Sequence, residues 1–180
     1  YVSMLGSELP TTDRVTFRAF GGAQNSGSGD HGTACAEIVH DMAPGAELYL
    51  ALVSTNVDIE NAIGWLQANG VMVATMSLGF TTLSPHDGTG SLNDEIAASV
   101  AGGDIAWATS AGNSRQGHWQ GRTTDSDGDG WVELAPGEEL NAFPGTLRSG
   151  DRVRSSMTWN DWDRPTNDYA LYLYRIAADG

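Results

Sequence analysis

The first half of the chain alternates short apolar runs with segments of helical periodicity. Residues 46–53 (AELYLALV) form a nearly continuous apolar run, which is typical of a strand buried on both faces of a parallel sheet. Residues 58–69 follow with helical spacing, and Asp58 is the expected N-cap and Gly70 the expected stop. The apolar positions of this helix are Ile59, Ala62, Ile63 and Leu66. A strand followed by a helix is thus predicted.

The same order is repeated further along the chain. Residues 71–78 (VMVATMSL) predict a second buried strand, residues 92–101 a second helix, and residues 104–110 (DIAWATS) a third strand. Repeated strand-helix units indicate the α/β class, with a parallel sheet that carries helices on both faces.

The character of the sequence changes after Asn113, where it becomes polar and rich in Gly and Trp. Residues 153–159 alternate polar and apolar positions, and residues 169–176 are dense in aromatic and aliphatic side chains, so both predict antiparallel strands. The Asp-, Asn- and Pro-rich residues 160–168 between them predict a long turn. We therefore expect a domain boundary near Gly117.

Composition excludes several classes of function. Of the 180 residues, 40% are hydrophobic and 18% charged, as in a globular protein, and no apolar run approaches the ~18 residues that span a bilayer. The net charge of −14 and the lack of clustered basic residues make nucleic acid an unexpected partner. The single cysteine, Cys35, cannot form an internal disulfide. Because the chain opens at Tyr1 without a basic or apolar leader, we expect any signal peptide to lie outside it.

The first candidate for chemistry is His31, in the run His-Gly-Thr-Ala-Cys-Ala after the Gly- and Ser-rich loop at 25–30. Such a loop leading into small residues predicts a histidine at a helix N-terminus, at the sheet edge where α/β folds bind ligands. The helix dipole there disfavours a charged imidazolium, which leaves a neutral base. On residue type alone, a loop histidine without a function is the alternative.

Two further motifs follow predicted strands. Residues 110–113 (SAGN) place Asn113 on a glycine turn, where its amide could donate to a developing oxyanion. Residues 75–79 (TMSLG) end a strand in a glycine and could pair with an extended peptide. Taken alone, each motif is also a common turn.

The order of these motifs along the chain resembles that of the subtilisin-like serine peptidases, the subtilases. The motifs are HGT at 31–33, APGA at 43–46, MSLG at 76–79 and SAGN at 110–113. The resemblance covers roughly residues 25–115. It implies a subtilisin-like core at 1–116, with His31 as general base and acid and Asn113 as oxyanion donor. It also implies a substrate-binding segment at the specificity pocket, formed by Ser77, Leu78 and Gly79, and hence a polypeptide substrate.

The departures from the family pattern concern the catalytic aspartate and serine. Subtilases carry the aspartate on a hydrophobic strand before the histidine and the serine in a G-T-S-x-A-x-P motif after the asparagine, and neither motif occurs here. We expect the aspartate to lie before Tyr1 and the serine after Gly180, in the remainder of the parent peptidase, so that this fragment alone is inactive. Thr75 stands where the family usually has Asn.

Cys35 lies one helical turn after His31. In the subgroup similar to proteinase K, a free cysteine occupies a matching place beneath the histidine. A small, buried apolar side chain is the alternative interpretation.

The run D-S-D-G-D-G at 125–130 is a candidate calcium loop, because alternate carboxylates on a tight turn converge on one point. The expected ligands are Asp125, Asp127, Asp129, the Trp131 carbonyl and Glu133. Pro136 stands where an EF-hand has its bidentate Glu, and Glu138 or Glu139 could substitute. An acidic surface turn without a metal is the alternative.

Residues 117–180 resemble the pre-peptidase C-terminal type of β-sandwich, here partial and inserted into the catalytic domain. The whole chain then indicates a fragment of a secreted, extracellular serine endopeptidase. Three alternatives stay open: a pseudopeptidase without a nucleophile, a calcium-dependent binding module, and an unrelated α/β domain whose motifs match by chance.

Overall fold

The computed structural model describes residues 2–21, 30–114, 117–142, 145–161 and 166–175. The chain forms two compact units, one of residues 1–110 with 157–180 and the other of residues 111–156. Most of the Gly- and Ser-rich loop at 25–30 lies outside the described residues. The predicted domains, 1–116 and 117–180, remain a prediction.

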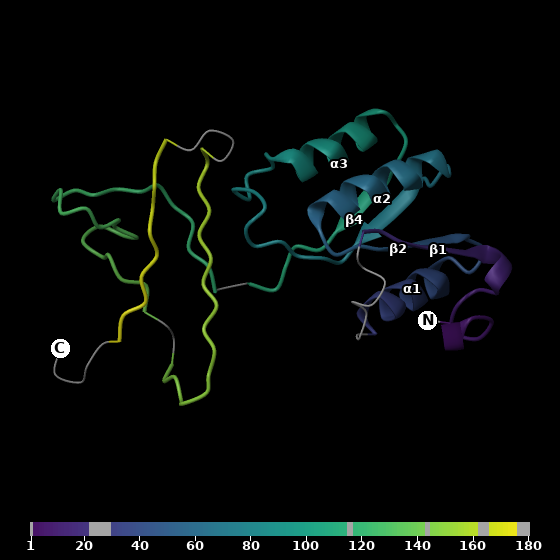
Figure 1. The fold of residues 1–180 in the computed structure, drawn as a ribbon, viewed down its shortest axis with the longest axis horizontal. Coiled ribbons are helices and arrows are strands. Elements are labelled where there is room, and N and C mark those ends of the chain that lie inside the picture. Colours follow the sequence, from purple (N-terminus) through teal and green to yellow (C-terminus); the bar gives the residue numbers. More distant parts are fainter. Residues whose placement is uncertain (1, 22–29, 115–116, 143–144, 162–165, 176–180) are drawn as a thin grey trace. The chain divides into compact units, whose positions relative to one another are not determined.

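Four strands form two parallel pairs in the first unit (Figure 1). Strand β1 (Val15–Ala19) pairs with β2 (Leu48–Leu52), and β3 (Val73–Met76) pairs with β4 (Ala106–Thr109). Three of these strands lie inside the runs predicted from the sequence. The parallel pairing and the intervening helices fit the predicted α/β class.

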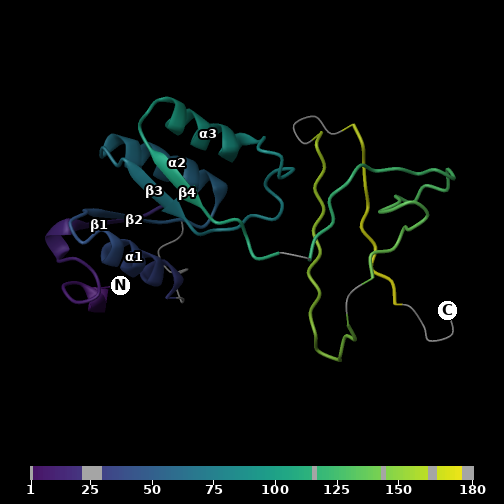
Figure 2. The same ribbon diagram turned by 180° about the vertical axis from the view of Figure 1, so that it is seen from behind.

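Three helices cover these strands from two sides. Helix α1 (His31–Met42) lies on one side of the β1–β2 pair, and α2 (Asn56–Ala68) and α3 (Ser91–Ala101) lie on the other (Figures 1 and 2). Short 3-10 turns, η1 (Val2–Met4) and η2 (Thr12–Arg14), precede β1. None of the helices in the described part of the chain has the length and apolarity needed to span a membrane.

Side chains on the two faces of β2 pack in two different apolar clusters, because successive side chains of a strand point to opposite sides. Leu48 packs with Ala36 of α1, and Leu9 joins this cluster. Tyr49, the next residue, packs on the other side against a cluster formed by Leu66, Ala74 and Ile105. Helix α1 and helix α2 are therefore held on opposite faces of the same strand.

Helix α2 begins earlier than the sequence predicts. Its N-cap is Thr55 and not Asp58, and the helix starts at Asn56. The Thr55 hydroxyl accepts from the Asp58 amide at 3.1 Å, while the Asp58 carboxylate accepts from the Thr55 amide at 3.0 Å. This reciprocal pair satisfies two amides that a helix start leaves open, so Asp58 acts at the third helical position.

The predicted stop of α2 at Gly70 is confirmed. Gly70 has a positive φ of 68°, and its amide donates to the Gln67 carbonyl at 3.0 Å. The Val71 amide donates to the Leu66 carbonyl at 3.1 Å. These two bonds and the left-handed residue between them form a Schellman end, which a residue without Cβ adopts at little cost.

The prediction that strand 71–78 is buried on both faces is wrong. Ala74 is buried, but Val73 is 72% exposed and Thr75 is also exposed. Helix α2 covers the face that carries Ala74, whereas α1, which could cover the other face of a continuous sheet, packs on the β1–β2 pair. The apolar run therefore predicted the strand correctly, but it did not predict which faces of the strand are covered by helices.

The inserted antiparallel β-sandwich is not shown. Among the described residues, no strand lies after β4. The described part of the second unit contains only isolated β-bridges, such as that between Thr124 and Glu133. Trp159 and Tyr169, from the two predicted strands, pack edge to face with ring centroids 5.4 Å apart. The sequence pattern marked extended segments, but a strand also needs the ladder bonds of a partner.

Candidate active site and acidic loop

His31 is the first residue of α1, as the sequence predicts. Asp30 occupies the N-cap without a side-chain capping bond, and the Ala34 amide donates to the Asp30 carbonyl at 2.8 Å. The small side chains after His31 let the helix start without crowding, and the His31 side chain stays exposed. An exposed imidazole at a helix start is accessible to another molecule.

The structure brings His31 to the predicted substrate-binding segment. The Nε2 atom of His31 lies 2.9 Å from the carbonyl oxygen of Ser77, 46 residues away in the sequence. Ser77 comes directly after β3, at the carboxyl end of that strand. Since a carbonyl oxygen only accepts, Nε2 carries the proton in this contact. Two motifs singled out separately in the sequence thus meet.

The predicted segment 77–79 is joined to the end of β4 through Ser110. The Ser110 amide donates to the Met76 carbonyl at 3.2 Å, and its hydroxyl donates to the Leu78 carbonyl at 3.1 Å. The Leu78 side chain is 39% exposed and Gly79 is exposed. The segment is therefore anchored by its backbone and accessible at its surface.

Asn113 is exposed and belongs to the second unit, whereas His31 belongs to the first. Its turn contains Gly112, which has a φ of +82° and so lies in the region that favours glycine. The roles expected for these two residues, general base and acid for His31 and oxyanion donor for Asn113, remain predictions.

Cys35 is partly buried on α1, and its Sγ lies 4.0 Å from Nε2 of His31. The two side chains are four residues apart and share one face of the helix. The thiol therefore lies beside the imidazole, at the limit of a sulfur hydrogen bond.

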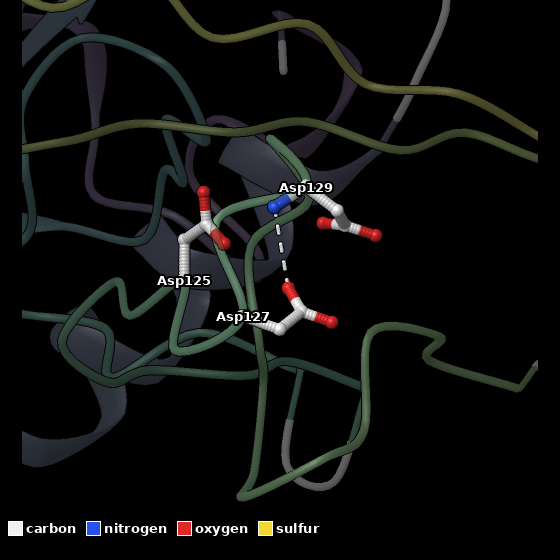
Figure 3. Close-up of side chains that lie close together, drawn as sticks. All are labelled: Asp125, Asp127 and Asp129. Atoms are coloured by element: carbon white, nitrogen blue, oxygen red, sulfur yellow. Dashed lines mark hydrogen bonds between the residues drawn. The ribbon is translucent and has the colours of Figure 1, made fainter.

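The acidic loop lies in the second unit. Asp125, Asp127 and Asp129 each offer a carboxylate oxygen within 4.8 Å of the others (Figure 3). Calcium binds oxygen at about 2.3–2.6 Å, so oxygens around one ion lie at most about 5 Å apart. The spacing of the three carboxylates fits such an ion.

Main-chain amides of the loop itself hold these carboxylates in place. Asp125 accepts from the Gly128 amide at 2.7 Å and from the Gly130 amide at 3.1 Å. Asp127 accepts from the Asp129 amide at 3.3 Å, the bond drawn in Figure 3. These bonds fix the fold of the loop through the same aspartates that the sequence predicts as ligands.

Glu133, also predicted as a ligand, lies outside this group of three. It is 7% exposed, and its carboxylate accepts from the Ser126 hydroxyl and from the Thr124 hydroxyl at 3.3 Å. The bond from the Ser126 hydroxyl is the main cause that lowers the pKa of Glu133. In the structure Glu133 closes the base of the loop, where its amide also donates to the Thr124 carbonyl at 2.8 Å.

Glu139, predicted from the sequence as a substitute ligand, is affected by the charges of the acidic loop. Partial burial, followed by the negative charges of Asp129, Asp127, Glu133 and Asp125, raises the pKa of Glu139. Trp131 is 41% exposed, and its amide donates to Asp129 at 2.9 Å. The loop is therefore a concentration of negative charge that a cation would relieve.

Sequence reasoning missed the polar link between α3 and β4. The Trp107 indole N–H donates to the Ser99 hydroxyl at 2.8 Å, and that hydroxyl donates to the Ile96 carbonyl at 2.8 Å. Ser99 is only 1% exposed. A serine among the apolar positions of a predicted helix is the signal that could have revealed it.

The fold and the site define a class of protein with helices between parallel strands and a histidine beside an exposed segment at a strand end. The model of the subtilase family matches residues 15–144, which include His31, the segment 77–79, Asn113 and the acidic loop. The chain belongs to the subtilase family, whose members are serine peptidases. No curated protein and no solved structure matches it.

Proposed function

We propose that this chain is part of a serine endopeptidase in which His31 is the general base and acid. The observation that carries the proposal is the 2.9 Å contact between Nε2 of His31 and the Ser77 carbonyl, in a chain of the subtilase family. A base must lie within reach of the reacting bond, and the segment after β3 is where an extended substrate would pair.

In the proposed reaction, His31 takes the proton of a serine hydroxyl as that oxygen attacks the peptide carbonyl. It then returns the proton to the amine that leaves. For this step Nε2 must be unprotonated, so the imidazole has to release its present bond to Ser77 and adopt the other tautomer.

Asn113 is the proposed donor to the oxyanion of the tetrahedral intermediate. An uncharged amide can donate to the developing negative charge without changing its own protonation state. Its place on a glycine turn after β4 and inside the family match supports this role.

The serine and the aspartate of the triad are proposed to come from other residues of the same protein. Neither the G-T-S-x-A-x-P motif nor the aspartate motif occurs in the 180 residues. We therefore expect the isolated chain to bind an extended peptide without hydrolysing it. Secretion of the protein also remains a proposal.

Peptide hydrolysis by the protein that contains these residues tests the proposal. Replacing His31 with Ala should lower kcat by at least about 10³-fold, since the nucleophile loses its base. Replacing Asn113 with Ala should lower kcat by about 10²–10³-fold, a magnitude established on subtilisin and adopted for this chain. His118→Ala, at an exposed histidine of the second unit, is the control and should leave the rate unchanged.

Hydrolysis that survives His31→Ala unchanged would overturn the assignment of the base. Hydrolysis that is lost equally in His118→Ala would also overturn it, because the effect would then not depend on the position of His31.

Calcium binding by the acidic loop is a second proposal, supported by the convergence of Asp125, Asp127 and Asp129 within 4.8 Å. Three carboxylates supply half or less of the six to eight oxygens that calcium takes, so carbonyls and water would complete the set. The Trp131 carbonyl and Glu133 are the predicted additions, and for Glu133 this requires release of its bond to Ser126.

Calorimetric titration of the chain with calcium tests this second proposal. Uptake of one ion should be lost in Asp127→Asn and kept in Asp151→Asn. Asp151 is the matched control because it too is an exposed aspartate of the second unit that accepts a main-chain amide, that of Arg148 at 2.7 Å. No heat of binding at millimolar calcium would end the proposal.

A further inference from the structure

The Leu78 carbonyl takes its hydrogen bond from a side chain, although the strand ladder would supply a main-chain amide. In the β3–β4 pair, the Ala106 amide donates to the Met72 carbonyl at 2.8 Å, and the Ser110 amide donates to the Met76 carbonyl at 3.2 Å. Continued by two residues, this pattern would bring the amide of Gly112 to Leu78. In the structure, the Leu78 carbonyl instead accepts from the Ser110 hydroxyl at 3.1 Å.

The hydroxyl takes the place of a ladder amide where the chain after β4 leaves strand conformation. Gly112 has a φ of +82°, so the chain after Ser110 has left strand conformation. Ser110 nevertheless holds two carbonyls of the β3 chain, one with its amide and one with its hydroxyl. The chain that follows β3 is thus hydrogen-bonded to Ser110 as far as Leu78, two residues beyond the end of β3 at Met76.

The hydroxyl bond lies on the side of the segment that does not face His31. Neighbouring carbonyls of an extended segment point toward opposite edges. The Ser77 carbonyl is directed to His31, and the Leu78 carbonyl is directed to Ser110. Ser110 therefore fixes the segment from the β4 side, opposite the carbonyl that contacts His31.

We infer that Ser110 is a positioning residue for substrate pairing: its hydroxyl sets the orientation of segment 77–79 against β4. This inference rests on the proposed peptidase function. A threonine at position 110 keeps the hydroxyl, whereas an alanine removes it and leaves the Leu78 carbonyl without that donor.

The first experiment measures backbone order by NMR relaxation on the 180-residue chain. In Ser110→Ala the amide order parameters of Leu78 and Gly79 should fall, and in Ser110→Thr they should return to the original values. Ser7→Ala is the matched control, because the Ser7 hydroxyl also donates to a carbonyl, that of Met4, at 3.1 Å. It should leave Leu78 and Gly79 unchanged. Unchanged order parameters in Ser110→Ala would overturn the inference.

The second experiment measures kinetics on the protein that contains these residues. Ser110→Ala should raise KM for an extended peptide substrate about two- to tenfold, the loss expected for one neutral hydrogen bond, with kcat little changed. A minimal ester that cannot pair with the segment should show no change in KM, and Ser110→Thr should restore the peptide KM. An equal loss of kcat on both substrates would overturn the positioning role.

The two experiments separate this inference from the proposed function. A protein without peptidase activity would overturn the function, and with it the role of Ser110 in substrate pairing. The order parameters would still decide whether the Ser110 hydroxyl holds the segment.

Discussion

Removal of the Ser99 hydroxyl should destabilise the first unit through its link from α3 to β4. Ser99→Ala eliminates two hydrogen bonds, each 2.8 Å long, one to the Ile96 carbonyl and one from the Trp107 indole. Each bond contributes a net ~0.5–1.5 kcal/mol, and the better helix propensity of Ala returns about 0.5 kcal/mol. We therefore expect the free energy of unfolding to fall by about 0.5–2.5 kcal/mol.

The assay is urea denaturation of the chain followed by circular dichroism, with a double-mutant cycle. Trp107→Phe removes the indole N–H, so adding Ser99→Ala to it leaves no unpaired donor. The double variant should lose less stability than the sum of the two single variants. A loss below about 0.5 kcal/mol in Ser99→Ala, or strict additivity in the cycle, would show that the Ser99 hydroxyl does not stabilise the contact between α3 and β4.

Three further predictions concern titratable groups. In the isolated chain, long-range nitrogen NMR should find His31 with its proton on Nε2, and a proton on Nδ1 would contradict the contact with Ser77. The Ser126 hydroxyl lowers the pKa of Glu133, so the loop is stabilised above the ordinary glutamate pKa of about 4.3 and loses this stabilisation as the pH falls through the lower folded value. The Ser126 amide resonance followed against pH checks this, and Glu133→Gln should abolish the transition. Partial burial and, after it, the charges of the nearby carboxylates raise the pKa of Glu139, and added calcium should lower this pKa because the ion neutralises those charges. An unchanged carboxyl titration of Glu139 at saturating calcium would argue against the metal.

Elements with strong periodic patterns were predictable from the sequence. The strand runs containing β2, β3 and β4 and the stop of α2 at Gly70 were predicted because apolar runs and a left-handed glycine leave local signals. Strand β1, Val15–Ala19, was missed although Val15, Phe17 and Ala19 alternate with polar residues. The alternation is short, and its ladder partner, β2, lies 33 residues further along the chain.

The parts that failed depend on tertiary context. Asp58 was predicted as an N-cap from its residue type, but the helix starts three residues earlier, where Thr55 is the N-cap and its hydroxyl accepts from the Asp58 amide. The antiparallel strands predicted after Asn113 needed partners that a pattern along one segment cannot reveal.

The candidate site was predictable in its members and not in its contacts. His31 and Ser77 were named from separate motifs, yet only the fold brings them within 2.9 Å. The hydrogen bond from the Ser110 hydroxyl to the Leu78 carbonyl could not be predicted from the sequence. It involves a single side chain, and one serine at a strand end leaves no periodic signal.

Labelling of the protein that contains this chain with a fluorophosphonate probe tests directly whether His31 is the base of a serine peptidase. We predict stoichiometric modification of one serine outside these 180 residues, and a strong loss of labelling in His31→Ala but not in His118→Ala. An unlabelled protein would identify a pseudopeptidase, and labelling that is independent of His31 would contradict its role as the base.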